Sequence, residues 1–250
     1  MNDLVDVLES RTGTSCAVGA GGKKTTLYHL ATTHPGRVGL TSTVPTARFP
    51  SRLGAYEVIA EGGELVDAVL QAARRHPLVA FARPEVKRAR YGGLSSQLLE
   101  EIQEARVFDL LLVKGDGARR RWIKAPTADE PVIPIGTTTV LPVVSARAMG
   151  EPLTEQIAHR LHRVEKVTGA RYGETVRPAH IARLLADPDG SLKGTGEMRV
   201  IPILNMVDNK ELETAALEAA EAALEMTDRY DRIVLTCHLS PDRLVAVVSR

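Results

Sequence analysis

The sequence predicts an α/β protein built on a doubly wound, mostly parallel sheet. Short apolar runs that suit strands alternate with amphipathic stretches that suit helices along all 250 residues. The most apolar run, residues 108–113, is bounded by charge, as expected of a strand that is covered on both faces. A glycine-rich turn at residues 19–22 follows the first strand and precedes a helix. Strands joined by helices in this way form right-handed parallel units.

The first half of the chain gives the following elements in order. A short helix is expected in the first dozen residues, and the helix that begins at Lys24 ends before Pro35, because proline lacks the amide that a helix needs. The expected strands are residues 15–18, 37–43, 78–81 and 108–113; the expected helices are 24–33, 64–76 and 94–105; residues 84–93 are expected to form a surface loop.

In the second half, prolines between residues 122 and 134 predict an extended segment that makes few ladder hydrogen bonds. The expected strands are residues 140–144, 200–204, 232–236 and 244–248; helices are expected within 152–186 and at 211–227, with a loop at 188–196. This division predicts a core at residues 1–150, a mostly helical insertion at 151–198 and a sheet-completing part at 199–250, together in one compact domain.

Composition narrows the class of protein. A formal net charge of +1, with acids and bases interspersed, gives no reason to expect a nucleic-acid partner. Cys16 and Cys237 are too few for a disulfide framework, which favours a reducing cytoplasm. The first ten residues carry three acids and no basic start of a signal peptide, and no apolar run is long enough for a bilayer, so no membrane partner is expected.

The glycine-rich turn predicts a phosphate site. In a P-loop, backbone amides face the phosphates, a lysine reaches their oxygens and a hydroxyl holds Mg²⁺. The residues expected to bind the ligand here are Gly19, Ala20, Gly21, Gly22, Lys23, Lys24, Thr25 and Thr26. Lys23 is expected to reach the phosphate, although Ala17 and Lys24 stand where the strict pattern has glycine and a hydroxyl. In an alternative register Lys24 reaches the phosphate and Thr25 holds the metal; a second alternative is a plain flexible connection.

Polar residues after later strands add to this site. Asp116 follows the apolar strand and is a candidate catalytic residue and metal ligand, together with Thr25, although Asp-Gly is also a common turn. Thr43 ends another strand and is expected to face the same ligand, or else to cap the next turn. Lys124 and Glu130 are candidates for an ion pair or for substrate contacts, or are solvated.

Asn205 and Asp208 follow a late strand, as the Asn-Lys-x-Asp loop does in guanine-nucleotide-binding proteins. Met206 replaces the lysine, and capping of the following helix is the alternative. A phosphate loop, an acid and a base-reading loop in this order along one sheet edge are typical of P-loop NTPases.

The sequence resembles the accessory proteins of selenium-dependent molybdenum hydroxylases, the YqeC-like family. The segments that carry the resemblance are Val18 to Lys23, Thr41-Ser42-Thr43, Gly115 to Ala118, Lys124-Ala125-Pro126, Glu130 to Pro134, Thr137 to Thr139, His162 to Glu165, Thr168-Gly169, Leu192 to Gly194 and Leu204-Asn205. The resemblance implies a cytoplasmic protein that binds ATP or GTP. It further implies a role in maturing or delivering a molybdenum cofactor or its selenium, with a hydroxylase or cofactor-synthesis proteins as partners.

Two residues depart from the family pattern. Lys24 stands where the family usually has Thr or Ser, and Lys114 stands where it usually has Glu. A cation cannot ligate Mg²⁺. We therefore expect lysines to stand in partly for the metal, and hydrolysis to be slow or absent. The alternatives are a non-catalytic carrier of a molybdopterin-type cofactor and an ATP-dependent ligase or kinase that uses the same loop.

Overall fold

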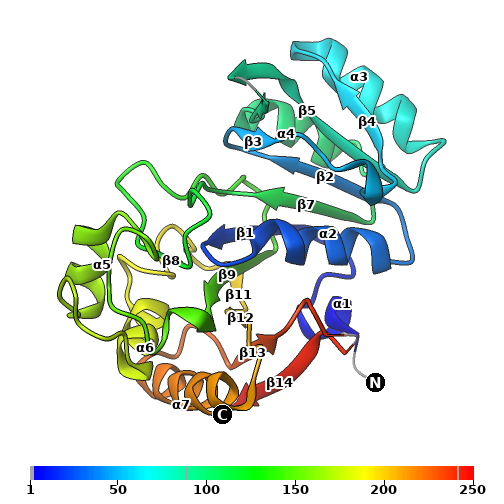
Figure 1. Cartoon of the computed structure of the whole chain (residues 1–250). Coiled ribbons are helices and arrows are strands. Elements are labelled where there is room, and N and C mark those ends of the chain that lie inside the picture. The colour runs from blue at the N-terminus through cyan, green and yellow to red at the C-terminus, as the bar shows by residue number, and fades with distance from the viewer. Residues whose placement is uncertain (1–2, 88, 241) are drawn as a thin grey trace.

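The computed structural model describes residues 3–87, 89–240 and 242–250 (Figure 1), which include seven α-helices and fourteen strands. The helices are α1 (Leu4–Val7), α2 (Lys23–Thr33), α3 (Gly62–Ala73), α4 (Ser96–Glu104), α5 (Leu161–Thr168), α6 (Pro178–Ala186) and α7 (Lys210–Met226). The strands are β1 (Gly13–Gly19), β2 (Val38–Ser42), β3 (Thr46–Ala47), β4 (Tyr56–Ile59), β5 (Leu78–Lys87), β6 (Arg90–Gly92), β7 (Leu110–Lys114), β8 (Ile123–Lys124), β9 (Thr139–Ser145), β10 (Ala158–His159), β11 (Arg199–Val200), β12 (Ile203–Asn205), β13 (Arg232–Thr236) and β14 (Leu244–Ser249). Among the described helices, none combines the length and the apolar character needed to cross a bilayer.

The main sheet has the strand order β14-β13-β12-β9-β1-β7-β2-β5-β6-β3, with β4 beside β5 and β11 beside β9. The pairs from β13 to β5 are parallel, whereas β14 and β6 pair antiparallel with their neighbours. The predicted α/β, doubly wound and mostly parallel architecture is therefore confirmed. Because β2 lies on one side of β1 and β9 lies on the other, the sheet changes winding direction at β1. Ligands of open α/β sheets bind beyond the carboxyl ends of the strands at such a point.

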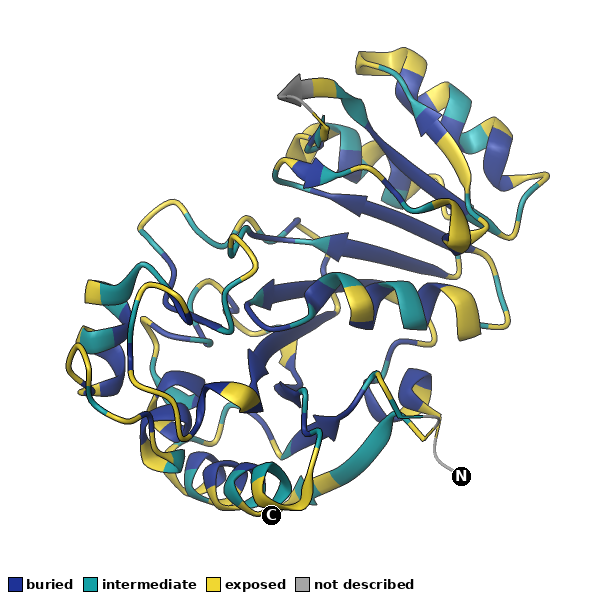
Figure 2. Ribbon diagram, viewed as in Figure 1, coloured by how far each residue is buried: buried dark blue, intermediate teal, exposed yellow. Residues whose placement is uncertain are grey.

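Helices cover both faces of the sheet, so successive residues of a strand pack on opposite sides. On one face Ala17 and Leu112 lie in a cluster with Leu27 of α2. On the other face Val18 and Val113 lie in a cluster with residues of α3 and α4. The central strands are accordingly buried along their length (Figure 2). This burial explains why their sequences read as continuous apolar runs.

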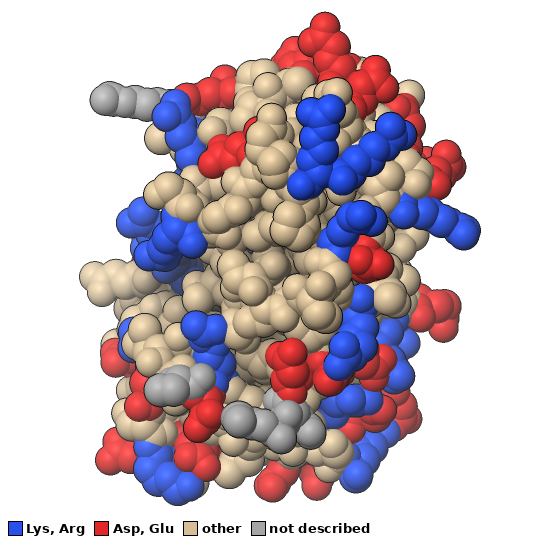
Figure 3. All heavy atoms as spheres, turned by 90° about the vertical axis from the view of Figure 1, so that its right-hand side faces the viewer, with Lys and Arg blue, Asp and Glu red and all other residues tan. Residues whose placement is uncertain are grey.

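A smaller unit lies beyond the carboxyl end of β1, at the left of Figure 1. It consists of residues 117–135 and 151–198, which we call the cap, and it contains the two-stranded β8–β10 sheet with α5 and α6. Residues 199–250 return to the main sheet, where β12 pairs with β9. The opposite face, at the amino ends of β1, β2 and β7, carries interspersed acidic and basic side chains (Figure 3).

Two sequence predictions need correction, and short strands were not predicted. The surface loop expected at residues 84–93 is wrong, because β5 continues to Lys87 and pairs with β6 in a hairpin; residue 88 lies outside the described residues. The register shifts on either side of Glu85, so the hairpin has no regular alternation that the sequence would reveal. The strand expected at 200–204 is divided into β11 and β12, with Pro202 between them. The short strands β3 and β4 were missed.

Candidate functional site

The glycine-rich turn connects β1 to α2 at the centre of the carboxyl edge, and its glycines are required sterically. Gly19 has φ +89°, and a Cβ there would lie 2.5 Å from the carbonyl oxygen of Val143. Gly22 has φ +125°, and a Cβ there would lie 2.1 Å from Nδ2 of Asn205. Side chains other than glycine are therefore excluded by backbone conformation and by close neighbours together.

Two of the four turn amides are already bonded within the protein. The Gly19 amide donates to Oδ2 of Asp116 at 3.0 Å, and the Ala20 amide donates to the carbonyl of Val143 at 2.7 Å. The amides of Gly21 and Gly22 have no acceptor among the described residues. The expectation that all four amides are open to a ligand is therefore wrong for Gly19 and Ala20 in this conformation.

Asp116 is the anion that the turn holds. It follows β7, is 1% exposed, and accepts the Gly19 amide with Oδ2. The ammonium of Lys23 lies 2.9 Å from Oδ1, and the ammonium of Lys124 donates to Oδ2 at 2.8 Å. Burial alone would raise the pKa of Asp116, but the charges of Lys23 and Lys124 outweigh it and lower that pKa below its ordinary value. Asp116 is therefore a carboxylate at neutral pH.

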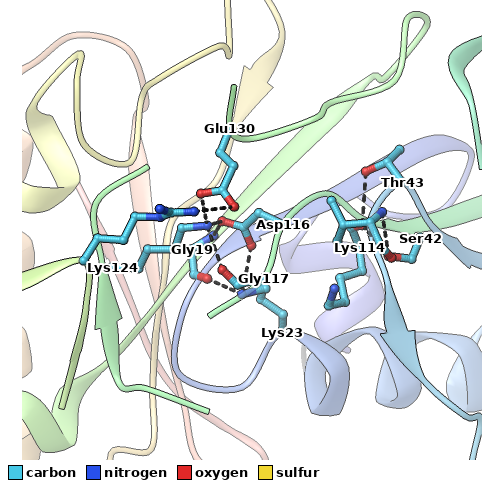
Figure 4. Close-up of polar contacts among 11 residues, drawn as sticks. Gly19, Lys23, Ser42, Thr43, Lys114, Asp116, Gly117, Lys124 and Glu130 are labelled. Atoms are coloured by element: carbon cyan, nitrogen blue, oxygen red, sulfur yellow. Dashed lines mark hydrogen bonds and ion pairs between the residues drawn. The ribbon is translucent and has the colours of Figure 1, made fainter. Parts of the chain in front are cut away.

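The charges continue from the turn into the cap. Lys124 pairs with Oε2 of Glu130 at 2.8 Å, and Glu130 pairs through Oε1 with Arg160 at 3.3 Å. The ion pair predicted between Lys124 and Glu130 is thus present. Figure 4 shows the ammonium groups of Lys23 and Lys124 on either side of the Asp116 carboxylate. An alternating chain of five charges therefore joins the start of α2 to the start of α5.

Lys114, the last residue of β7, has a different environment. Its Nζ is buried and has no hydrogen-bond acceptor among the described residues. Burial, followed by the nearby charge of Lys23, lowers the pKa of Lys114 to about 7. The oxygen of its backbone carbonyl accepts from the Ser42 hydroxyl at 2.9 Å (Figure 4). The nearby charge of Asp116 does not offset these effects, and a bound anion would raise the pKa of Lys114 and give its Nζ the hydrogen-bond acceptor that the described residues do not provide.

The hydroxyls expected to meet the ligand are used elsewhere or lie apart. Thr43 donates to the carbonyl of Val132 at 2.7 Å, which ties the end of β2 to the cap. Thr26 is buried and lies 2.9 Å from Nε2 of His238. Thr25 is exposed, whereas Lys24 is partly buried, and burial followed by the charges of Arg120 and Arg90 lowers its pKa.

Asn205 and Asp208 are held by protein partners. The Asn205 side chain donates to the carbonyl of Gly21 at 2.7 Å and accepts from Thr236 at 2.9 Å, so it fixes the turn to β13. Asp208 pairs with Arg147, and its Oδ1 lies 3.3 Å from Sγ of Cys237. Neither helix capping nor a free base-reading pair describes these contacts, since the cap of α7 is Asn209. Guanine recognition by this pair stays a prediction.

The site does not fit Mg²⁺. Both oxygens of Asp116 face ammonium groups. Thr25 is exposed whereas Asp116 is buried. The residues that the structure describes contain no group of three His, Cys, Asp or Glu side chains able to hold a metal ion. Lys24 and Lys114 add positive charge where the P-loop pattern has a hydroxyl and an acid. The predicted metal role of Thr25 and Asp116 is therefore not supported by their positions.

Comparison with known proteins places this chain in a family. Residues 15–162 match the family profile described as "YqeC protein", which is more than half of the chain. The chain belongs to the YqeC family. A relative in Escherichia coli (strain K12), "Uncharacterized protein YqeC", is 24% identical over 183 residues, which cover 70% of this chain and 68% of the relative.

The YqeC match covers the whole charged chain from Lys23 to Arg160, together with the glycine-rich turn and Lys114. Asn205 and Asp208 lie outside the matched range. Sequence reasoning missed Arg160 and the Asn205 contact with the turn. Arg160 stands in an ordinary charged stretch, and its backbone has a left-handed conformation with φ +67° directly before α5.

Proposed function

We propose that this YqeC family member binds the phosphate of a nucleotide, ATP or GTP, at the glycine-rich turn without Mg²⁺. The observation that carries the proposal is the internal complex in which the Gly19 amide and the Lys23 ammonium hold the carboxylate of Asp116. A phosphate group offers the same kind of oxygens to the same donors, and charge-assisted contacts of this kind are the strong ones.

A phosphate has to replace this carboxylate. The cavity beside Gly19, Asp116 and Lys124 has a volume of only about 10 Å³, which is at the lower limit for one water. When the Lys23 ammonium pairs with the phosphate in place of Asp116, we expect the remaining phosphate oxygens to accept hydrogen bonds from three further groups. These are the unbonded amides of Gly21 and Gly22 and the ammonium of Lys114. Asp116 keeps Lys124 as its partner, so the exchange leaves no buried charge unpaired.

The same geometry supports binding with little hydrolysis. A residue that orients an attacking water needs a free oxygen, and both oxygens of Asp116 face ammonium groups. Catalysis of phosphoryl transfer also depends on charge placed at the leaving and attacking oxygens. We therefore expect ligand binding, more than turnover, to be the contribution of Lys23 and Asp116.

Titration calorimetry with ATP and with GTP tests the binding site. We expect similar affinities in Mg²⁺ and in EDTA, and about a 10- to 100-fold loss of affinity in Lys23→Met, the effect of one charge-assisted hydrogen bond. Lys166→Met is the matched control, because Lys166 is 78% exposed on the cap. Strict Mg²⁺ dependence with rapid turnover would contradict the proposal, as would equal affinities in the two variants.

The family resemblance extends the proposal to the maturation of selenium-dependent molybdenum hydroxylases. Binding of a nucleotide phosphate at Lys23 would change the contacts of Asp116, and this change would reach the cap through Lys124 and Glu130. We therefore propose that the partner protein binds the cap. Deletion of the gene in a host that makes such a hydroxylase should lower the enzyme's activity but not its abundance. Activity unchanged in the deletion strain would remove this part of the proposal.

A further inference from the structure

A cavity of about 510 Å³ lies between the cap and the amino end of α7. Small-molecule sites have volumes of roughly 300–1,000 Å³, so this cavity is large enough for a small organic ligand. Figure 1 shows α6 of the cap beside α7, and the first residue of α6 and the first turn of α7 both line the cavity. The apolar side chains of the lining are Trp122, Met149, Pro178, Leu212 and Ala215, and the charged ones are Arg147, Glu151 and Glu211.

The cavity begins next to the glycine-rich turn. A Cβ on Gly21 would lie 2.5 Å from the backbone nitrogen of Ser145, so the turn lies directly against the end of β9. The Ser145 amide donates to the carbonyl of Trp122 at 3.1 Å, and Arg147 follows two residues after Ser145. Trp122 and Arg147 both line the cavity. Along these contacts a single residue, Ser145, separates the Gly21 backbone from the lining of the cavity.

Trp122 is the single tryptophan of the chain, and its backbone is bonded on both sides. Its amide donates to the carbonyl of Ile157 in the cap at 2.8 Å, and its carbonyl accepts from Ser145 at the end of β9. Its side chain is only partly buried. Every nucleobase has a flat π face that stacks on aromatic side chains. An indole that is fixed in this way and lines a cavity is therefore suited to hold a base.

We propose that the nucleoside of the nucleotide occupies this cavity, with its base stacked on the indole of Trp122. The inference rests on the proposed phosphate site at the glycine-rich turn and adds the position of the rest of the ligand. The carboxylates of Glu151 and Glu211 can accept from ribose hydroxyls or from an exocyclic amine, but they repel a phosphate, which stays at the turn. The base in this position does not depend on Asn205 and Asp208, which bond to other residues of the protein.

A larger cavity, of about 740 Å³, is not suited to the nucleoside. It is lined by Gly13 and Leu111, at the amino ends of β1 and β7. Because β1 has seven residues, its two ends are roughly 20 Å apart, and the glycine-rich turn is at the other end. A nucleoside attached to a phosphate at the turn does not reach that cavity.

The fluorescence of Trp122 tests the proposal in the wild-type protein, since no other residue is a tryptophan. ATP and GTP carry a base, whereas tripolyphosphate offers the same phosphates without one. We expect all three to bind at the turn, and only the two nucleotides to quench Trp122. Equal fluorescence changes with all three ligands would overturn the inference and leave the phosphate site intact. Failure of all three to bind in calorimetry would overturn both proposals.

Trp122→Leu gives a second test by titration calorimetry. We expect this variant to lose affinity for ATP and GTP by about 5- to 150-fold, the effect of one lost stacking contact, and to bind tripolyphosphate as wild type does. Trp122→Phe retains an aromatic ring and should keep most of the affinity. Ala215→Phe, which fills the cavity from α7 and keeps Trp122, should cause the same selective loss as Trp122→Leu.

Tyr172→Leu is the matched control, because Tyr172 is an aromatic residue that is 64% exposed on the cap and does not line the cavity. It should bind all three ligands as wild type does. Equal losses of affinity for ATP and tripolyphosphate in Trp122→Leu and in Ala215→Phe would mean that these variants disturb the turn and not the nucleoside. That result, or unchanged affinity for ATP and GTP in both variants, would overturn the inference.

Discussion

Asp116→Asn is expected to destabilise the protein by about 3–5 kcal/mol, because it removes the charge shared by two buried lysines. Lys23 and Lys124 are 6% and 3% exposed, so water cannot replace the lost carboxylate. Asparagine has nearly the same shape as aspartate, so the lost stability comes from the removed charge and not from a cavity. Urea unfolding followed by circular dichroism measures the change in the free energy of unfolding.

Asp189→Asn is the control for this experiment. Asp189 pairs with Lys166 at 3.9 Å, and both side chains are more than half exposed, so removing its charge should cost less than about 1 kcal/mol. A similar small cost for Asp116→Asn would mean that the buried lysines lose their protons without penalty. The charged chain would then not hold the cap to the glycine-rich turn.

The sequence predicted the fold well because its signals are local. The apolar run of β7 and the proline and glycine after α2 depend only on neighbouring residues, and both elements lie where they were expected. The hairpin of β5 and β6 was missed because its register shifts around Glu85, which removes the alternation that would indicate paired strands.

The charges at the site were harder to predict. The strand order predicts that these charged residues lie at the carboxyl edge of the sheet. It does not predict which residues form ion pairs, because a lysine side chain is long and can reach several acids. Asn205 shows the limit most clearly. It bonds to the carbonyl of Gly21 across 184 residues of sequence, and no spacing rule links an amide after one strand to the turn after another.

The affinity for a divalent anion is expected to fall as pH rises above 7, because the buried ammonium of Lys114 has to be protonated in the complex. Its pKa in the free protein is about 7, with Lys23, Asp116, Lys24 and Lys124 as its charged neighbours. A bound anion stabilises the ammonium and raises that pKa. Between the two values, binding therefore takes up a proton, and the Kd rises about tenfold per pH unit.

Sulfate is the suitable probe, since its charge is constant over this range. In Lys114→Met the slope should vanish and the affinity below pH 7 should be lower. The pH dependence of the stability of the free protein is an independent test. A lysine with a lowered folded pKa binds fewer protons than in the unfolded chain between about pH 7 and its ordinary value, so stability should rise with pH across that range. Equal slopes for wild type and Lys114→Met in both measurements would show that Lys114 is not the group that receives the anion.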